Sequence, residues 1–493
     1  MTGSPLNRAA TTTGDVPHRR MLIGGQWCDA ADGAVFTSEN PATEESAGTF
    51  PAGSAADVDD AVAAARAAAP AWAELGWDRR AQLLRELAAA VREERELLAR
   101  LDTTDGGSPI TAMRADVDGA VSELEYFAGI ASQARGSTAP PSVDSLTYTQ
   151  RQPYGVVGRI IPYNHPLKFA AGKCAAPLAA GNAVVLKPGE QTSLSALELA
   201  RIATEILPAG VLSVVTGAGD LVGARLVEHP DVPRIAFTGS VPTGRAVLHG
   251  AAHDIKHVSL ELGGKNPVLV FPDVDPERAA NAAVAGMNIA RSTGQSCGSG
   301  SRLFVHDDIR DPFLDALHRR LDRMRVGDPH DEATDVGPLS FRAHYERVTG
   351  FVATARREGA TVSYGGDRPA GLSRGFYLRP TVLTDLDDAM TVVQEEIFGP
   401  VISVLGWRDV DDVVRRANAL PLGLTANIWT NDVSTALRTA AVVEAGCVYV
   451  NGTGRRPTGM PFGGWKRSGI GQENGPEELI SYTREKAVTV TLL

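Results

Sequence analysis

One cysteine lies in a stretch of small and polar residues, Gly294-Gln295-Ser296-Cys297-Gly298-Ser299-Gly300. A structural cysteine is commonly packed among aliphatic side chains, where it behaves as a small hydrophobic residue. Glycine and serine neighbours instead let backbone and ligand approach the sulfur of Cys297 closely. The stretch therefore predicts either a reactive thiol or a buried bystander, and the other motifs have to separate the two.

Composition predicts a globular protein of more than one domain. The chain has 493 residues, 43% of them hydrophobic and 22% charged, which is enough for two or three domains with sizeable cores. The net charge of −11 argues against nucleic acid or a membrane surface as partner, since both require a basic face. The four cysteines are widely separated, so we expect free thiols and no metal site. Without a signal peptide or a bilayer-spanning apolar run, we expect a cytoplasmic protein.

The elements that would position Cys297 alternate between strands and helices. Residues 1–18 are expected to form a disordered tail, and Asp78 is expected to cap an amphipathic helix that continues to Leu101. From residue 156 onward, helical stretches separate five apolar, β-branched runs: 156–161, 183–186, 211–215, 234–237 and 257–262. This alternation predicts an α/β fold with a parallel sheet. Two further runs, 145–152 and 486–493, alternate as peripheral strands that could pair with each other or with another subunit.

Ligands of parallel sheets bind at the carboxyl ends of the strands, so the loops there are informative. The first strand leads into PYNHP (162–166), where the amide of Asn164 could donate to an oxyanion or simply make a turn. The second leads into KPGE (187–190), which could bind ribose hydroxyls or form a solvated turn. These loops alone leave both interpretations open.

The remaining loops suggest a phosphate-binding site and a general base. The third strand is followed by Gly217, but the glycine spacing is wrong for a dinucleotide fingerprint. The fourth leads into FTGSVPTG (237–244), which puts hydroxyl groups at a helix N-terminus, a natural seat for a pyrophosphate. The fifth ends in Glu261, whose burial would raise its pKa toward that of a general base unless it pairs with Lys265.

Together these stretches resemble the aldehyde dehydrogenase superfamily over about residues 20–493. In order they are PYNHP (162–166), KPGE (187–190), FTGSVPTG (237–244), LELGGKNP (260–267), GQSC (294–297), EEIFGP (395–400) and PFGGWKRSG (461–469). The resemblance implies an aldehyde-dehydrogenase-like α/β fold, with two doubly wound parallel-sheet domains and a small β oligomerisation element. It implies an NAD-binding domain of residues 19–132 and 153–263, and a catalytic domain of residues 264–478. Residues 133–152 and 479–493 would be the oligomerisation strands of a homodimer or homotetramer.

The resemblance also implies roles for individual residues. Cys297 would be the nucleophile, Asn164 the side-chain oxyanion donor and Glu261 the general base. Residues expected to contact the cofactor are Ile161, Pro162, Tyr163, Lys187, Glu190, Gly217, Phe237, Gly239, Ser240, Leu262, Glu396 and Phe398. Of these, Lys187 and Glu190 would hold the adenosine ribose, Ser240 the pyrophosphate, and Glu396 with Phe398 the nicotinamide ribose and ring. The substrate tunnel would be lined by His165, Lys168, Phe169, Arg291, Ser296, Arg456 and Phe462.

The implied activity is oxidation of an aldehyde to a carboxylic acid through a thiohemiacetal and a thioester on Cys297. NAD is expected over NADP, because a 2′-phosphate would bring like charge against Glu190. One alternative is a CoA-acylating semialdehyde dehydrogenase, whose members usually lack the glutamate found here at position 261. The other is a catalytically silent member with a binding or structural role.

Departures from the common family pattern concern the substrate tunnel. Arg291 lies six residues before Cys297, as in the succinate-semialdehyde branch, in which that arginine holds the substrate carboxylate. The second arginine of that branch is replaced here by Gly172. The substrate would therefore be a carboxylate-bearing semialdehyde, or else Lys168, Arg291 and Arg456 pair with nearby acids.

Overall fold

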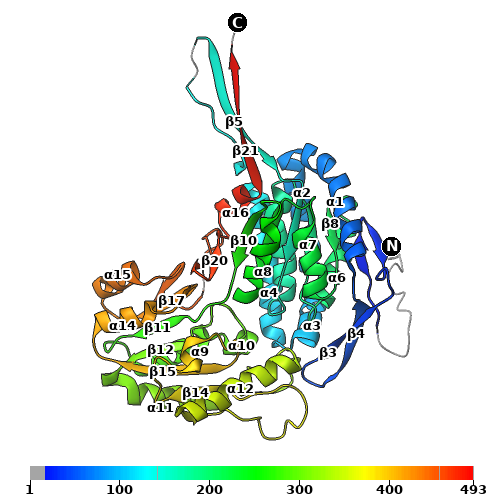
Figure 1. Ribbon diagram of the computed structural model, residues 1–493. Coiled ribbons are helices and arrows are strands. Elements are labelled where there is room, and N and C mark those ends of the chain that lie inside the picture. Colours follow the sequence, from blue (N-terminus) through cyan, green and yellow to red (C-terminus); the bar gives the residue numbers. More distant parts are fainter. Residues whose placement is uncertain (1–16, 141–142, 455, 492–493) are drawn as a thin grey trace.

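A computed structural model of the protein describes residues 17–140, 143–454 and 456–491. Within these residues two large sheets, each flanked by helices, make up the body, and a two-stranded arm projects from it (Figure 1). No helix among these residues is long and apolar enough to cross a membrane.

The first sheet contains the five strands that the sequence predicts. Its order is β2 (Gln26–Cys28), β1 (Met21–Ile23), β8 (Leu212–Val214), β7 (Ala183–Lys187), β6 (Val156–Ile160), β9 (Arg234–Thr238), β10 (His257–Glu261) and β20 (Gly469–Ile470). The strands from β8 to β10 run parallel. Every residue of β6, β7 and β9 is buried, as expected for a parallel sheet covered on both faces. The doubly wound α/β fold is confirmed.

Helices of the first half of the chain cover this sheet. They are α1 (Ala55–Glu74), α2 (Gly76–Glu93), α3 (Arg95–Gly106), α4 (Ile110–Ile130), α5 (Lys173–Ala179), α6 (Leu194–Thr204), α7 (Ala224–Glu228) and α8 (Val241–Ala252). The chain order reverses between β6 and β9, which are hydrogen-bonded neighbours. A reversal of this kind opens a crevice at the carboxyl ends of the strands, and the loops that begin at residues 161 and 239 lie beside it.

The second sheet follows directly after Glu261. Its order is β13 (Thr361–Tyr364), β14 (Thr381–Thr384), β15 (Val401–Trp407), β12 (Arg302–His306), β11 (Pro267–Val270), β17 (Thr425–Trp429) and β18 (Cys447–Val450). All neighbouring pairs are parallel except β13 with β14. Its helices are α9 (Pro276–Gly286), α10 (Ile289–Ser292), α11 (Arg310–Asp322), α12 (Arg342–Glu358), α13 (Thr391–Gln394), α14 (Val410–Asn418) and α15 (Val433–Val442).

The two peripheral strands pair with each other. β5 (Ser145–Pro153) and β21 (Thr483–Thr491) run antiparallel over nine residue pairs, and β21 follows α16 (Pro476–Ser481). Figure 1 shows this arm extending away from both sheets. Two smaller pairs complete the described part of the fold: β3 (Val35–Asn40) with β4 (Glu45–Pro51), and β16 (Leu422–Gly423) with β19 (Trp465–Lys466).

Two local expectations need comment. Residues 1–16 of the expected tail lie outside the described residues, whereas His18 is anchored through hydrogen bonds to Thr49 and Asp29. The expectation of one helix from Asp78 to Leu101 is wrong. α2 begins at Gly76, whose positive φ of 77° lets the chain turn, and the helical path is interrupted at Glu94. Both helices still contribute apolar side chains to one core, so the apolar spacing alone did not reveal the break.

Candidate active site

The loop that carries Cys297 is held by a buried asparagine. Asn266 Nδ2 donates to the backbone oxygens of Cys297 (2.7 Å) and Ser299 (2.9 Å), and its Oδ1 accepts from the N–H of Thr425. Gly294 has a φ of +74°, and a Cβ there would lie 2.5 Å from the carbonyl oxygen of Gly399. The glycine-rich sequence thus permits a tight loop whose nucleophile is fixed in place.

The thiol of Cys297 is partly buried, and two acids and two cations act on it. Burial, reinforced by Glu261 and Glu396, raises the pKa of Cys297 to about 12, although Lys173 and Arg456 act in the opposite direction. Reactive cysteines commonly have a lowered pKa in electropositive surroundings. Here the resting thiol is protonated near neutral pH, and nucleophilic attack requires the loss of that proton.

Asn164 lies directly beside this loop. Its Nδ2 donates to the carbonyl oxygen of Gln295 (2.9 Å), two residues before Cys297. A side-chain amide has two N–H donors, so one remains for an oxygen atom bound next to the sulfur. Asn164 is buried, and its orientation is therefore set before any ligand arrives, as oxyanion stabilisation requires.

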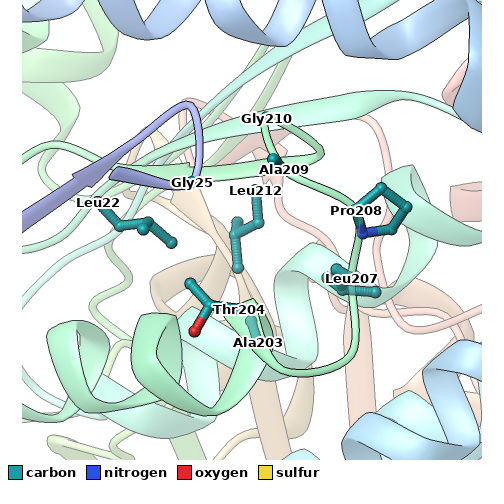
Figure 2. A pocket seen from close by; sticks show the side chains of 9 residues that line it. All are labelled: Leu22, Gly25, Ala203, Thr204, Leu207, Pro208, Ala209, Gly210 and Leu212. Atoms are coloured by element: carbon teal, nitrogen blue, oxygen red, sulfur yellow. The ribbon is translucent and has the colours of Figure 1, made fainter. Parts of the chain in front are cut away.

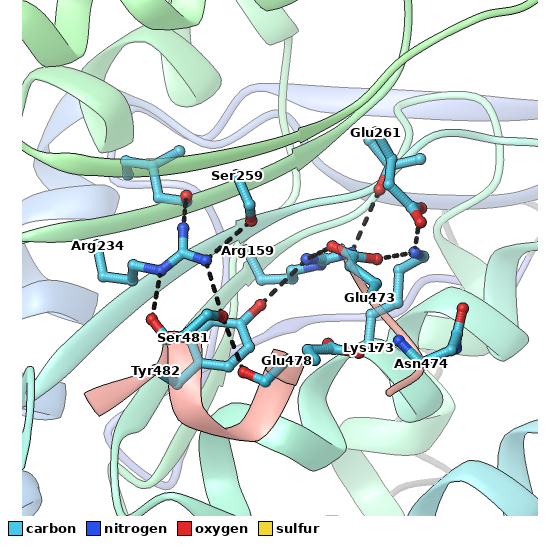
Figure 3. Close-up of polar contacts among 12 residues, drawn as sticks. Arg159, Lys173, Arg234, Ser259, Glu261, Glu473, Asn474, Glu478, Ser481 and Tyr482 are labelled. Carbon is cyan, nitrogen blue, oxygen red and sulfur yellow. Dashed lines mark hydrogen bonds and ion pairs between the residues drawn. The ribbon is translucent and has the colours of Figure 1, made fainter. Parts of the chain in front are cut away.

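Glu261 ends β10 and joins a buried charge network rather than pairing with Lys265 (Figure 3). Lys173, from the start of α5, donates to both Glu261 and Glu473. Glu473 is in turn bound by both terminal nitrogens of Arg159, at 2.6 and 3.0 Å. All four side chains are buried, so each charge depends on its partner rather than on solvent.

This network sets the protonation of Glu261. Burial, together with the charge of Glu473, raises the pKa of Glu261 to about 7, while Lys173 acts to lower it. Burial would also raise the pKa of Glu473, but Arg159 and Lys173 hold it well below its usual range. A carboxyl group with a pKa near neutrality suits general base chemistry.

Lys265 remains unpaired. Its Nζ is buried without a hydrogen-bond partner among the residues described, and burial lowers the pKa of Lys265 to about 7.

Apart from Glu396 and Phe398, the residues expected to contact the cofactor lie at the carboxyl ends of β6, β7, β8, β9 and β10 or in the loops that follow them. Ser240 is exposed and caps the twelve-residue helix α8, with its Oγ accepting from the N–H of Thr243 (3.3 Å). A Cβ on Gly239 would lie 2.4 Å from the ring of Phe237, and one on Gly217 would lie 2.4 Å from Val222. The glycines therefore let the backbone pass close to its neighbours beside an exposed helix N-terminus, which fits the pyrophosphate of a dinucleotide.

Lys187 and Glu190 lie at the same edge of the sheet. Burial lowers the pKa of Lys187, while Glu190 and Asp220 oppose that shift. In the sequence, Pro188 and Gly189 separate Lys187 from Glu190. A Cβ added to Gly189 would lie 3.0 Å from the backbone nitrogen of Tyr163. The loops after β6 and β7 are thus in direct contact, and they bring Ile161, Pro162 and Tyr163 next to this pair.

Glu396 and Phe398 lie on a loop that α12 holds from outside. Glu396 Oε1 accepts from the N–H of Gly264 (3.1 Å), and burial raises the pKa of Glu396 to about 7. Phe398 has a φ of +60°, a strained value for a bulky residue. His344 Nε2 bonds to the carbonyl oxygen of Phe398 (2.7 Å), and Arg347 donates to the oxygens of Ile397 and Glu396. Three bonds from one helix therefore maintain the strained loop.

The predicted tunnel residues fall into two groups. In the first, Asp116 of α4 accepts from Arg291 (2.9 Å) and bonds to His165 (2.5 Å), whose ring contacts that of Phe169. Burial would raise the pKa of Asp116, but His165, Lys168 and Arg291 hold it well below its usual range.

In the second group, the guanidinium of Arg456 lies over the ring of Phe462, 4.1 Å from its centroid. Ser296 is partly buried beside Cys297.

The sequence left two alternatives for Arg291, binding of a substrate carboxylate or pairing with an acid of the protein. Its bond to Asp116 gives it an acidic partner within the protein, as the second alternative requires.

Sequence reasoning missed the residues that hold the predicted site residues and their loops in place through hydrogen bonds and ion pairs. They are Asn266, Lys173, Glu473, Arg159, Asp116, His344 and Arg347. A usable signal existed for Lys173, a lone cation in the run Ala170-Ala171-Gly172-Lys173-Cys174-Ala175-Ala176, since a buried charge needs a partner. Asn266 lies inside the LELGGKNP stretch. Nothing local distinguishes Glu473 or His344.

A small pocket lies elsewhere, between the β1–β2 hairpin, the end of α6 and the start of β8 (Figure 2). Its lining residues include Leu22, Ala203, Leu207 and Leu212. It opens at the amino end of β8, away from the carboxyl ends where the residues above meet, and it plays no part in the site.

Comparison with known proteins agrees with this geometry. The sequence model of the aldehyde dehydrogenase family matches residues 27–488. The chain resembles the NAD⁺ complex of an aldehyde dehydrogenase from Bacillus cereus, with 40% identity, 97% of each chain covered and a TM-score of 0.94. A putative aldehyde dehydrogenase from Burkholderia cenocepacia shares 41% identity, with coverage of 96% and 97% and a TM-score of 0.93. Betaine aldehyde dehydrogenase from Staphylococcus aureus, in complex with NAD⁺, shares 34% identity, with coverage of 96% and 95% and a TM-score of 0.93. The chain belongs to the aldehyde dehydrogenase family and is an NAD(P)-dependent aldehyde dehydrogenase.

Proposed function

We propose that this protein oxidises an aldehyde to a carboxylic acid with NAD, through a thiohemiacetal and then a thioester on Cys297. The observation that carries the proposal is the meeting of three groups at one edge of the first sheet. Asn164 bonds to the loop of Cys297, and the charge of Glu261 acts on the thiol. A nucleophile, an oxyanion donor and a base are the groups that acyl transfer through cysteine requires.

Three residues of the chain, Cys297, Asn164 and Glu261, each carry out one part of the reaction. Cys297 passes its proton to solvent and forms a bond to the aldehyde carbon, and the free N–H of Asn164 stabilises the aldehyde oxygen, which becomes negatively charged. NAD, when bound, supplies the acceptor for the hydride that leaves this carbon. Glu261 then takes a proton from water, which attacks the thioester and releases the acid. The sulfur of Cys297 leaves as a thiolate, and the proton held by Glu261 returns to it, which regenerates the thiol and the base.

The cofactor would be held by residues at the carboxyl ends of the strands of the first sheet, together with Glu396 and Phe398. Lys187 and Glu190 would bind the adenosine ribose, and Ser240 with the N-terminus of α8 would bind the pyrophosphate. Glu396 and Phe398 would contact the nicotinamide end. The exposed hydroxyl of Ser240 and the close backbone at Gly239 and Gly217 support this assignment.

A panel of aldehydes assayed at 340 nm with NAD and with NADP tests the proposal. We expect reduction of NAD and release of the free acid, without any need for CoA. A lack of reduction with every aldehyde would instead indicate a silent member of the family. An acyl-CoA product formed only when CoA is added would indicate the CoA-acylating alternative.

The arm of β5 and β21 supports a further part of the proposal, a homodimer or homotetramer. An isolated two-stranded ribbon is marginally stable in water, and Leu146 and Val490 of this arm are exposed. We propose that a second copy of the chain covers it. Light scattering should give two or four times the 51.9 kDa of one chain, and the mass of a single chain would contradict this.

A further inference from the structure

We propose that His344 is a positioning residue for hydride transfer, because it fixes the loop of Phe398 relative to the loop of Cys297. The inference rests on the proposed function, in which Glu396 and Phe398 contact the nicotinamide end of NAD. It adds α12, a helix that carries none of the predicted site residues, to the elements that bring the aldehyde carbon and the nicotinamide ring together.

The side chain of His344 makes one directed bond to the loop of Phe398. Its Nε2 donates to the carbonyl oxygen of Phe398 at 2.7 Å, and His344 is only 5% exposed. Burial lowers the pKa of His344 to about 4, so the ring is neutral near neutral pH and carries a single N–H. Because a carbonyl oxygen only accepts, that proton is on Nε2.

The backbone conformation that this bond maintains is unfavourable for Phe398. Its φ of +60° is a value that a bulky residue keeps only where its surroundings enforce it. Gly399 follows, and a Cβ there would lie 2.8 Å from the side chain of Val348 on α12. The loop is therefore both bonded to the helix and packed against it, so a loop freed from the bond would relax away from α12.

Three aromatic rings surround the imidazole of His344. The ring centroids of Phe341, Tyr163 and Phe398 lie 5.5, 5.9 and 6.1 Å from that of His344. Tyr163 belongs to the loop after β6, and its ring also contacts those of Phe341 (5.1 Å) and Phe398 (6.0 Å). Such tilted and edge-on contacts fix the plane of each ring. The imidazole is thus held in the orientation that its hydrogen bond requires.

The loop of Phe398 also touches the segment that carries the nucleophile. A Cβ on Gly294 would lie 2.5 Å from the carbonyl oxygen of Gly399. The backbones at these two positions are therefore in direct contact, three residues before Cys297 and one residue after Phe398. A displacement of one loop changes its distance from the other.

The residues that lead into α12 hold the nucleophile segment as well. The N–H of Ser340 donates to Oε1 of Gln295 at 3.1 Å, and Oγ1 of Thr293 donates to the carbonyl oxygen of Gly337 at 3.1 Å. α12 and the residues before it therefore bond to both loops. They form a common support that sets the position of the ring-facing loop relative to Cys297.

Arg347, one turn further along α12, has a different expected role. It donates to the carbonyl oxygens of Ile397 (2.8 Å) and Glu396 (2.6 Å), which precede Phe398. Glu396 would bind the ribose, whereas Phe398 would face the ring. We therefore expect Arg347 to affect chiefly the affinity for the cofactor, and His344 to affect chiefly the hydride step.

Single-turnover kinetics test the proposal, with enzyme and NAD in excess over an aldehyde or its 1-deuterated form. His344→Phe and His344→Leu lack the donor and should slow NADH formation about tenfold to a hundredfold, because a displacement of about 1 Å is enough to misalign the reacting atoms. The slowed step should show a primary deuterium isotope effect, which identifies it as hydride transfer. His344→Gln, whose amide can donate to the same oxygen, should keep most of the rate.

A matched control and a binding measurement separate positioning from other roles. His318→Phe on α11, where the ring bonds to Ser363 and stacks on Tyr364, should leave the rate unchanged. The Kd for NADH, from fluorescence titration, should stay near the wild-type value in His344→Phe and His344→Leu and should rise in Arg347→Met.

The possible failures are distinguishable. A wild type that reduces NAD with no aldehyde would contradict the proposed function. Wild-type rates in His344→Phe and His344→Leu, or a slowed step without an isotope effect, would show that His344 does not position the hydride step. An equal loss in His344→Gln, a raised Kd for NADH in the His344 variants, or unfolding of all three His344 variants would overturn the positioning role in favour of a binding or structural one.

Discussion

Lys173 donates hydrogen bonds to both Glu261 and Glu473, so one buried ammonium group joins the proposed base to a second carboxylate. Lys173 acts to lower the pKa of Glu261, whereas Glu473 acts to raise it. The pKa of the proposed base, Glu261, therefore depends on Lys173 and Glu473.

Replacing Lys173 should shift the pH dependence of turnover upward. Glu261 must be deprotonated to activate water, and its pKa of about 7 places the acid limb of kcat near neutral pH when deacylation limits the rate. Lys173→Met removes a charge that lowers this pKa, so the limb should move up by about one pH unit or more. Steady-state kcat measured from pH 5 to 10 checks this, with Lys173→Arg as the charge-retaining control. An unchanged limb, or one moved to lower pH, would show that Glu261 is not the titrating base.

Breaking the pair of Arg159 and Glu473 should destabilise the fold. Both side chains are buried and joined by two hydrogen bonds, so removing the cation leaves Lys173 as the one cation bonded to two buried carboxylates, Glu261 and Glu473. Arg159→Met should reduce the free energy of unfolding by about 3–5 kcal/mol. The control Arg66→Met breaks an exposed pair with Asp231 and should cost less than about 1 kcal/mol. Urea denaturation of both variants tests the difference, and equal losses would contradict it.

Removing the amide of Asn164 should slow the chemistry without affecting cofactor binding. Asn164→Ala should lower kcat by about 10²–10³-fold, the typical cost of one oxyanion donor. Fluorescence titration with NADH serves as the control, since the amide bonds to the loop of Cys297 rather than to the cofactor crevice. A decrease of less than about tenfold would make Asn164 a turn residue.

Cofactor choice should depend on Glu190. We expect kcat/KM to favour NAD over NADP, because a 2′-phosphate would meet the like charge of this carboxylate. Glu190→Gln should reduce the ratio of kcat/KM for NAD to kcat/KM for NADP about tenfold, chiefly by improving the use of NADP. Steady-state kinetics of the wild type and the variant with both cofactors test this. A wild type that prefers NADP, or a ratio that Glu190→Gln leaves unchanged, would rule this role out.

Much of the fold was predictable because it depends on local patterns. The five strands of the first sheet were recognised from apolar, β-branched runs separated by helical stretches, and each lies within two residues of its predicted bounds. The loops with Asn164 and Ser240 were identified because their residue types are unusual at strand ends, and the loop with Cys297 because small and polar residues surround the thiol in the sequence. The break at Glu94 was missed, since α2 and α3 share one apolar spacing and pack on one core.

The partners of the site residues were not predictable in the same way. Glu261 was weighed against Lys265, four residues away in the chain, yet its partner is Lys173, 88 residues away. Arg291 binds Asp116 across 175 residues. Pairings at such separations are decided by how α4 and α5 pack against the strand ends, which composition and spacing do not record.

The central claim, a covalent intermediate on Cys297, is tested most directly in Glu261→Gln. Mixed rapidly with NAD and an aldehyde, this variant should give a burst of NADH at 340 nm approaching one equivalent per site, followed by a slow phase. Intact-mass analysis during the slow phase should find the acyl group on Cys297, and Cys297→Ala should show neither burst nor adduct. Aldehyde oxidation by Cys297→Ala, or an acyl group on another residue, would contradict the account.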